Sequence, residues 1–120
     1  MQVESIRLET TINDGFDVPV IKASGEIDAY TVPDFRAALN RAIGFGAEDL
    51  IVDMTDIRYM DSSGFGALLG SVRKLGPEGG SVSLVGCNEA IARMLSITRL
   101  DTVFLIFPDL DTALEVIGDK

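Results

Sequence analysis

The first quarter of the chain alternates apolar and polar residues in the manner of strands. Apolar residues fall on roughly every second position over residues 3–12, which predicts a first strand, and residues 18–24 predict a second. The Asn-Asp-Gly sequence at residues 13–15 favours a turn between them, because Asn and Gly accept positive φ angles. Pro19 cannot donate a ladder hydrogen bond, so we expect it at an edge or a strand end. The pattern predicts an opening hairpin.

Four later segments carry apolar residues at helical spacing and begin with residues that favour helix starts. We expect Thr31 to cap the first, with Asp34 closing a capping box. Asp61 or Ser62 is the expected cap of the second helix, which extends to about residue 75. The expected caps of the last two helices are Asn88 and Asp109. Short apolar runs separate these helices and predict strands at residues 50–52, 81–85 and 103–107.

The order of these elements predicts the fold class. Strands that alternate with helices need crossover connections, which give a largely parallel sheet. The opening hairpin adds an antiparallel strand and makes the sheet mixed. We therefore expect one α/β domain with a mixed β-sheet of four to five strands flanked by about four helices. The helices should lie mainly on one face, which leaves the other face only partly covered.

Composition and charge narrow the possible partners. A chain of 120 residues with 47% hydrophobic and 24% charged residues fits a single folded domain. Ten basic and 19 acidic residues give a formal net charge of -9, which argues against nucleic acid and membrane partners. The N-terminal segment is charged and has no apolar signal core. A lone cysteine, Cys87, suits a reducing compartment, so the expected location is cytoplasmic.

The residue types present also limit the chemistry. The chain has no histidine, which excludes Ser-His-Asp and Cys-His nucleophiles, and Cys87 is the only soft metal ligand. There is no P-loop motif either. We therefore expect a protein that is not an enzyme and holds no metal or cofactor, with Cys87 as a small buried residue. Gly66 and Gly70 could admit a partner helix, and packing of their own helix explains them equally well.

Two segments stand out as candidate sites. Residues 59–66, Tyr-Met-Asp-Ser-Ser-Gly-Phe-Gly, follow a central strand and open the second helix. One interpretation of these residues is a helix cap with tightly packed glycines. The other is an exposed serine that can be phosphorylated, since a phosphate at a helix start meets the positive end of the helix dipole. Residues 25–31 can likewise be a turn and cap, or can place Asp28 beside the first segment. Both follow strand carboxyl ends, where open α/β sheets bind ligands.

Together these segments resemble the anti-sigma factor antagonist family, the stand-alone form of the STAS domain. The resemblance covers essentially the whole chain, read as one STAS domain over residues 1–120. It is carried by Gly-Glu-Ile-Asp at residues 25–28, the strand and aspartate at 50–53, the segment 60–66 and Phe-Pro at 107–108. The Asp-Ser-Ser-Gly sequence is the most specific part. Phe65 stands where the family often has leucine, so the position stays apolar.

The resemblance implies a partner switch. The unmodified antagonist would bind an anti-sigma factor that is also an ATP-using serine kinase, and this binding would free the sigma factor and so regulate transcription. The kinase would then phosphorylate the serine that follows aspartate, here Ser62, and a metal-dependent serine phosphatase would reverse the step. Ser63 would be structural, and the second helix would form part of the partner surface. The implied partner-binding residues are Asp28, Asp61, Ser62, Ser63, Gly64 and Phe65.

Two other classes of function compete with this interpretation. A STAS subunit that scaffolds a larger signalling complex would form stable oligomers and have no partner linked to a sigma factor. A hydrolase or metalloenzyme is disfavoured by the missing histidine.

Overall fold

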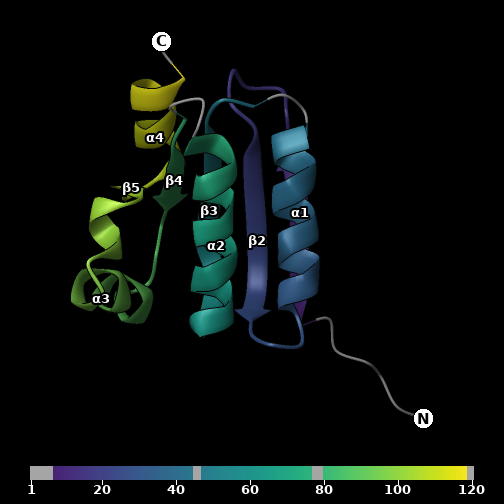
Figure 1. Ribbon diagram of the computed structural model, residues 1–120. Coiled ribbons are helices and arrows are strands. Elements are labelled where there is room, and N and C mark those ends of the chain that lie inside the picture. Colours follow the sequence, from purple (N-terminus) through teal and green to yellow (C-terminus); the bar gives the residue numbers. More distant parts are fainter. Residues whose placement is uncertain (1–6, 45–46, 77–79, 119–120) are drawn as a thin grey trace.

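The computed structural model describes residues 7–44, 47–76 and 80–118, which form a five-stranded sheet with helices on both faces (Figure 1). The elements in chain order are β1 (Leu8–Asn13), β2 (Val20–Ile27), α1 (Val32–Gly44), β3 (Leu50–Met60), α2 (Ser62–Leu75), β4 (Val82–Val85), α3 (Glu89–Ile97), the 3-10 turn η2 (Leu100–Thr102), β5 (Leu105–Phe107) and α4 (Leu110–Ile117). None of the helices within these residues is long and apolar enough to cross a bilayer.

The strands lie in the sheet in their chain order, β1-β2-β3-β4-β5. β1 is antiparallel to β2, and the remaining neighbours are parallel. The predicted mixed sheet of an α/β domain is therefore confirmed. Each parallel step moves in the same direction across the sheet, so right-handed crossovers place the connecting helices on one face. Figure 1 shows α1 and α2 side by side in front of β2 and β3.

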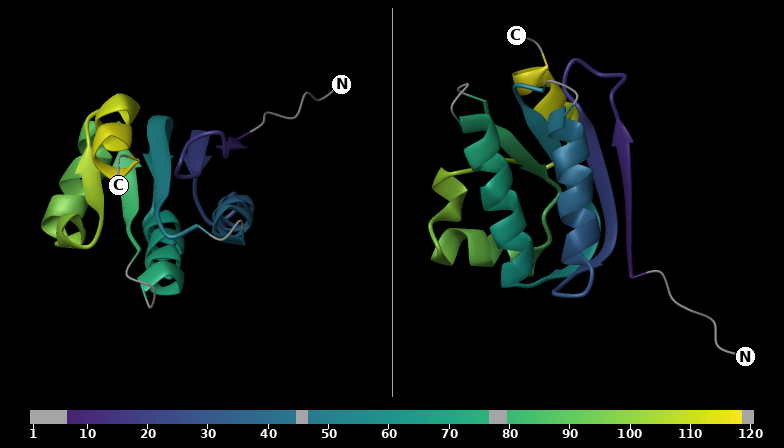
Figure 2. Two further views of the ribbon diagram at one scale, coloured as in Figure 1. Left: turned by 90° about the horizontal axis from the view of Figure 1, so that it is seen from above. Right: turned by 45° about the vertical axis from the view of Figure 1, so that its right-hand side comes forward.

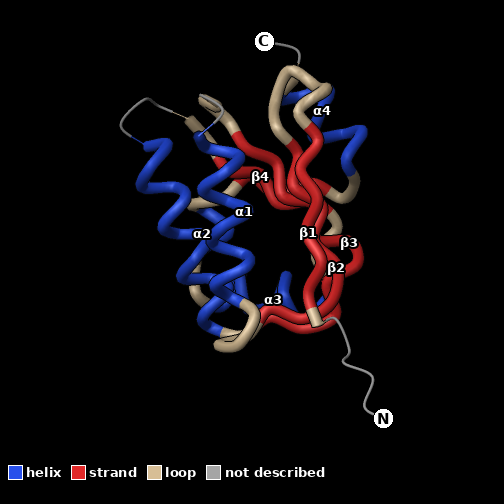
Figure 3. The backbone as a smooth tube through the Cα atoms, turned by 90° about the vertical axis from the view of Figure 1, so that its right-hand side faces the viewer, coloured by secondary structure: helices blue, strands red, loops and turns tan. Residues whose placement is uncertain are grey.

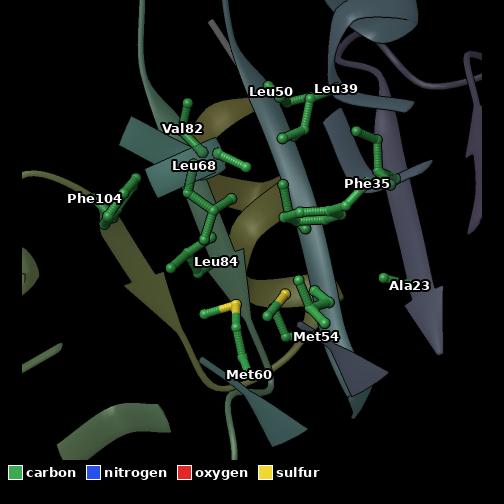
Figure 4. Packing of buried hydrophobic residues seen from close by; sticks show 14 of the residues in the cluster. Ala23, Phe35, Leu39, Leu50, Met54, Met60, Leu68, Val82, Leu84 and Phe104 are labelled. Atoms are coloured by element: carbon green, nitrogen blue, oxygen red, sulfur yellow. The ribbon is translucent and has the colours of Figure 1, made fainter. Parts of the chain in front are cut away.

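The larger core lies between the sheet and the layer of α1, α2 and α3. Alternate strand residues face it, so Ile21 and Val52 point into this core while their neighbours Val20 and Ile51 point to the other side. Phe35 and Leu39 of α1 are buried against these strands, and Leu68 of α2 packs beside them (Figure 4). The apolar stripes predicted for these helices thus form the main core.

A smaller core lies on the opposite face, where α4 is the helix that covers the sheet in the described chain. Figure 2, seen from above, places α4 on the other side of the strands from α1 and α2. Its members are Val18, Val20, Ile51, Val85, Ala113 and Ile117. Beyond α4 this face is open, since Thr55, Asp56, Arg58 and Tyr59 of β3 are exposed. The prediction of one covered and one partly covered face is confirmed.

Several predicted boundaries shift. Residues 3–6 of the first predicted strand lie outside the described residues. The hairpin connection covers residues 14–19 rather than a tight turn, and Asn13 Oδ1 accepts from the Gly15 N–H at 2.8 Å at its start. The tube in Figure 3 shows β1 following β2 along its length. β3 is longer than residues 50–52, and β5 is shorter than residues 103–107.

Thr31 precedes α1, and its carbonyl accepts from the Phe35 N–H at 3.2 Å, but the predicted capping box is wrong, whereas the other caps are confirmed. The Thr31 hydroxyl donates to the Glu26 carbonyl at 2.8 Å and accepts from the Asp28 N–H at 2.9 Å, and the Thr31 N–H donates to Asp28 Oδ1 and not to Asp34, so these groups close the loop before α1. Asn88 Oδ1 accepts from the Ile91 N–H, and Asp109 Oδ1 accepts from the Thr112 N–H. These two caps are purely local, while Thr31 has competing partners in the preceding loop.

Candidate functional site

The carboxyl ends of β2 and β3 meet at one edge of the sheet. Ile27 and Met60, the last residues of the two strands, are direct partners in the register. The Asp61 N–H then donates to the Ile27 carbonyl at 3.1 Å, which ties the start of α2 to the end of β2. Asp28 directly follows β2, and Asp61 directly follows β3. The structure therefore brings together the two segments that the sequence singled out separately.

The start of α2 is a capped helix end that leaves Ser62 at the surface. Asp61 is the N-cap, and its Oδ1 accepts from the Ser63 N–H at 2.8 Å. The cap fixes Ser62 as the first helical residue, where its side chain is exposed, while Ser63 is half-buried. Of the two candidate caps, Asp61 holds the role. The Ser62 hydroxyl is thus not used to close the helix and is open to an incoming group.

Gly64 is a glycine because the helix start packs tightly on the strand ends. A Cβ at this position would lie 2.4 Å from Met60 Cγ and 2.9 Å from Ile27 Cγ2. Both distances are too short for real contacts, so Met60 and Ile27 would have to shift to admit a side chain at this position. Gly64 and Phe65 are buried in the free chain, with Phe65 8% exposed, and their role in partner binding stays a prediction.

Asp28 is held in place by a network of donors. Its Oδ1 accepts from the N–H groups of Tyr30 at 2.9 Å and Thr31 at 3.1 Å, and its Oδ2 accepts from Arg7 Nη2 at 2.5 Å. Burial raises the pKa of this carboxyl, but the N–H groups of Thr31 and Tyr30, the Arg7 charge and the Thr31 hydroxyl lower it. The pKa lies below its usual value, so Asp28 is a fixed negative charge beside the start of α2.

Arg7 and Tyr30 extend this network and were not predicted from the sequence. The Arg7 guanidinium lies 5.8 Å from the centre of the Tyr30 ring and also contacts Glu26 Oε1 at 3.3 Å. Tyr30 is 85% exposed and projects next to Asp28. Arg7 lies far from residue 28 in sequence, so no local pattern pointed to it. The exposed tyrosine was visible in the segment 25–31, but its exposure depends on the loop geometry.

An apolar hollow of about 190 Å³ adjoins Ser62. Its lining residues are Met60, Asp61, Ser62, Phe65, Met94, Thr98 and Leu100. Met94 of α3 is 44% exposed and belongs to the lining of this hollow. The position of α3 beside the start of α2 creates the hollow, which helix periodicity alone does not reveal. Ser62 therefore lies at the rim of an apolar surface depression.

The remaining features lie away from this site or are inert. A larger hollow of about 440 Å³ at the opposite end of the sheet includes Asp14, Asp17 and Glu48, and none of the predicted site residues. The described residues contain no cluster of three or more His, Cys, Asp or Glu side chains suited to a metal ion. Cys87 is half-buried instead of fully buried, and burial raises the pKa of its thiol to about 11.

Comparisons with known proteins agree on one family. A sequence model of the STAS domain matches residues 7–113. The anti-sigma-B factor antagonist of Staphylococcus aureus is 32% identical over 96 residues, which cover 80% of this chain and 87% of that protein. The crystal structure of an anti-sigma factor antagonist from Mycobacterium paratuberculosis matches with a TM-score of 0.84 and 31% identity, covering 92% of this chain and 93% of the other. The phosphorylated form of the Bacillus cell fate determinant SpoIIAA has the same fold, with a TM-score of 0.70 and 24% identity over 90% of this chain and 99% of its own.

Proposed function

The chain belongs to the STAS domain family, and from that premise we propose that it is an anti-sigma factor antagonist switched by phosphorylation of Ser62. In its unmodified form it binds an anti-sigma factor that is also a serine kinase and thereby frees a sigma factor in the cytoplasm. The observation that supports this proposal most is the exposed Ser62 side chain, which follows the Asp61 cap and lies at the rim of an apolar hollow.

The unmodified surface suits a protein partner. A hydroxyl can be buried in an interface with one hydrogen bond, at small cost. The hollow next to it offers the exposed parts of Met94 and Leu100, and partner side chains that fill it would remove apolar surface from water. Asp28 and Asp61 supply fixed acceptors at the edge of the same surface, together with Ser63 from the first turn of α2. Gly64 and Phe65 shape the surface from below.

Phosphorylation reverses this preference. The kinase would transfer the γ-phosphoryl group of ATP to Ser62 Oγ, releasing ADP and the hydroxyl proton, and a phosphatase would hydrolyse the ester back to serine and inorganic phosphate. The phosphate adds about -1.5 to -2 charges beside Asp28 and Asp61. Burying this unmatched charge in the interface would cost roughly 2–5 kcal/mol, which weakens binding by about thirtyfold to several thousandfold. That range is sufficient for a switch.

Ser62 is the substrate in this scheme and not a nucleophile of the chain's own reaction. The sequence contains no histidine that could serve as a base for it, and the Asp61 carboxylate is occupied as the helix cap. The proposed activity is therefore regulated binding, and the chemistry belongs to the kinase and the phosphatase.

The site assignment is tested with the purified chain, the anti-sigma factor kinase of its host and ATP. Mass spectrometry should find one phosphate on Ser62 in the wild type and in Ser63→Ala, and none in Ser62→Ala. Ser62→Ala should bind the kinase as tightly as the unmodified wild type, whereas Ser62→Asp should bind at least about thirtyfold more weakly. Phosphate on Ser63 or Ser71 with none on Ser62 would contradict the assignment, and so would equal affinities of the two Ser62 variants.

A further inference from the structure

The lysine and arginine side chains of the described residues divide into two groups. Arg7, Lys22, Arg58 and Arg93 each form an ion pair with a neighbouring carboxylate. Five others make no ion pair within the described residues: Arg36, Arg41, Arg73, Lys74 and Arg99. The first four of these belong to α1 and α2. Unpaired positive charge is thus concentrated on the layer formed by these two helices.

This layer has the opposite sign from the rest of the chain. Within α1 and α2 the four basic residues are opposed by one acidic residue, Asp34, which gives a formal charge of +3. The whole chain has a formal charge of -9. All four basic side chains are exposed, so their field acts on the solution and on approaching molecules.

A groove runs between the two helices at the centre of this charge. We call it the basic groove; its lining residues are Arg36, Leu39, Asn40, Ala67, Gly70, Ser71 and Lys74. Arg36 leans across to α2, so that its Nη2 and Nη1 atoms would lie 3.8 and 3.9 Å from Cβ atoms built on Gly66 and Gly70. Lys74 on the far side donates to Asn40 Oδ1. Figure 1 shows α1 and α2 side by side, and the two helices are in contact.

The glycines beside the groove are not required by the packing of α2 itself. Cβ atoms at Gly66 and Gly70 would meet only the Arg36 guanidinium, at ordinary van der Waals distance. This contrasts with Gly64, which has no room for a side chain. Of the two interpretations of Gly66 and Gly70 that the sequence left open, the structure therefore favours contact with a partner, because glycine lowers helix stability and the packing of α2 does not require it here.

We propose that the basic groove is a docking surface for an acidic segment of a protein partner, with a carboxylate seated between Arg36 and Lys74. The groove holds about 70 Å³, roughly the space of two water molecules, which suits one carboxylate better than a nucleotide. The proposal rests on the proposed function for the identity of the partner, the anti-sigma factor kinase. Charge complementarity here would mainly speed and orient association.

The groove also connects docking with Ser62. Gly66 is one helical turn after Ser62, so a phosphate on Ser62 would lie within about 10 Å of the Arg36 guanidinium, which is about one Debye length at 0.1 M salt. With about -1.5 to -2 added charges, the formal charge of the layer of α1 and α2 falls from +3 to between about +1 and +1.5. Phosphorylation would thus weaken the attraction of an acidic partner at the groove as well as block the hollow.

The experiment measures association of the chain with the anti-sigma factor kinase of its host by stopped flow, at low and high ionic strength. Arg36→Gln/Lys74→Gln should lower the association rate constant about tenfold at low salt and flatten its salt dependence. The control Lys22→Gln/Arg93→Gln removes the same charge from ion-paired sites outside the groove and the hollow, and should change the rate less than about twofold. Equal effects of the two variants would overturn the proposal.

A second arm does not depend on the identity of the partner. Poly-L-glutamate added to the 15N-labelled chain should shift the amide signals of Gly66 and Gly70 and the side-chain amide of Asn40, and Arg36→Gln/Lys74→Gln should abolish these shifts. No shift at the groove, or a stronger response there to a short DNA duplex, would overturn the inference. If the groove responds to poly-L-glutamate but the wild-type chain does not bind the kinase, the proposed function fails and the acidic docking surface stands.

Discussion

At the scale of single residues, the glycines of α2 show how one residue type serves two purposes. Gly64 lies where the helix touches the ends of β2 and β3, and a Cβ there would be 2.4 Å from Met60 Cγ. Gly66, two residues later, has an open side with Arg36 Nη2 at 3.8 Å as the nearest atom. Packing requires the first glycine. The second leaves the surface of α2 next to Arg36 flat, although glycine makes the helix less stable than alanine would.

Alanine substitutions should therefore have opposite effects at these two positions. Gly64→Ala should destabilise the chain by about 1–3 kcal/mol, because Met60 and Ile27 must shift to admit the methyl group. Gly66→Ala should stabilise it by up to about 1 kcal/mol, because alanine favours the helix and meets no obstacle. Urea unfolding followed by circular dichroism measures both. Destabilisation by Gly66→Ala equal to that of Gly64→Ala would show that the packing around the start of α2 is misassigned.

At the scale of elements, α4 alone closes the second core within the described chain. Ala113 and Ile117 pack on Val20, Ile51 and their neighbours, and Ile117 is 4% exposed. Its neighbour Val116 is 55% exposed, although both are branched apolar residues one position apart. The short helix is held by this apolar stripe and by the Asp109 cap, since eight residues are too few for a stable isolated helix.

A charge placed on the two neighbouring positions should separate these roles. Ile117→Asp should cost about 3 kcal/mol or more, because it removes a buried side chain and places an unpaired charge in the smaller core. Val116→Asp should change the free energy of unfolding by less than about 0.5 kcal/mol, as expected for the surface. Thermal unfolding of both variants gives the comparison, and similar losses of Tm would mean that α4 does not cover the sheet as described.

The elements also show where the sequence suffices and where it does not. Asn88, Asp109 and Asp61 are caps that depend on amide groups two or three residues away, so their sequence context predicts them. Thr31 does not form the predicted capping box, because its N–H donates to the Asp28 carboxylate and its hydroxyl donates to the Glu26 carbonyl. The contact between Arg7 and Asp28 spans 21 residues, and the exposure of Met94 depends on how α3 sits beside α2. Such features arise from tertiary placement, which local periodicity does not carry.

At the scale of the whole molecule, the titratable side chains make the stability of the fold depend on pH in acid but not near neutrality. The chain has no histidine, so no side chain with an ordinary pKa near neutrality changes its charge there. Two carboxyls have pKa values below their usual range. Burial raises the pKa of Asp28, but amide donors and Arg7 lower it further than burial raises it. The hydroxyl and N–H groups of Thr112 lower the pKa of Asp109. These two groups prefer the charged form in the folded state.

This distribution predicts a stability profile that is flat near neutrality and falls in acid. A carboxyl whose folded pKa lies below its unfolded value stabilises the fold above the unfolded pKa, 3.8 here, and this stabilisation is lost as the pH falls through the lower folded value. Urea midpoints should thus change little between about pH 8 and 5.5 and drop below about pH 4. Asp28→Asn/Asp109→Asn should lower the midpoint at pH 7 and reduce the acid drop. An unchanged acid drop in this double variant would contradict this account, because the stabilising carboxylates would then have to lie elsewhere in the molecule.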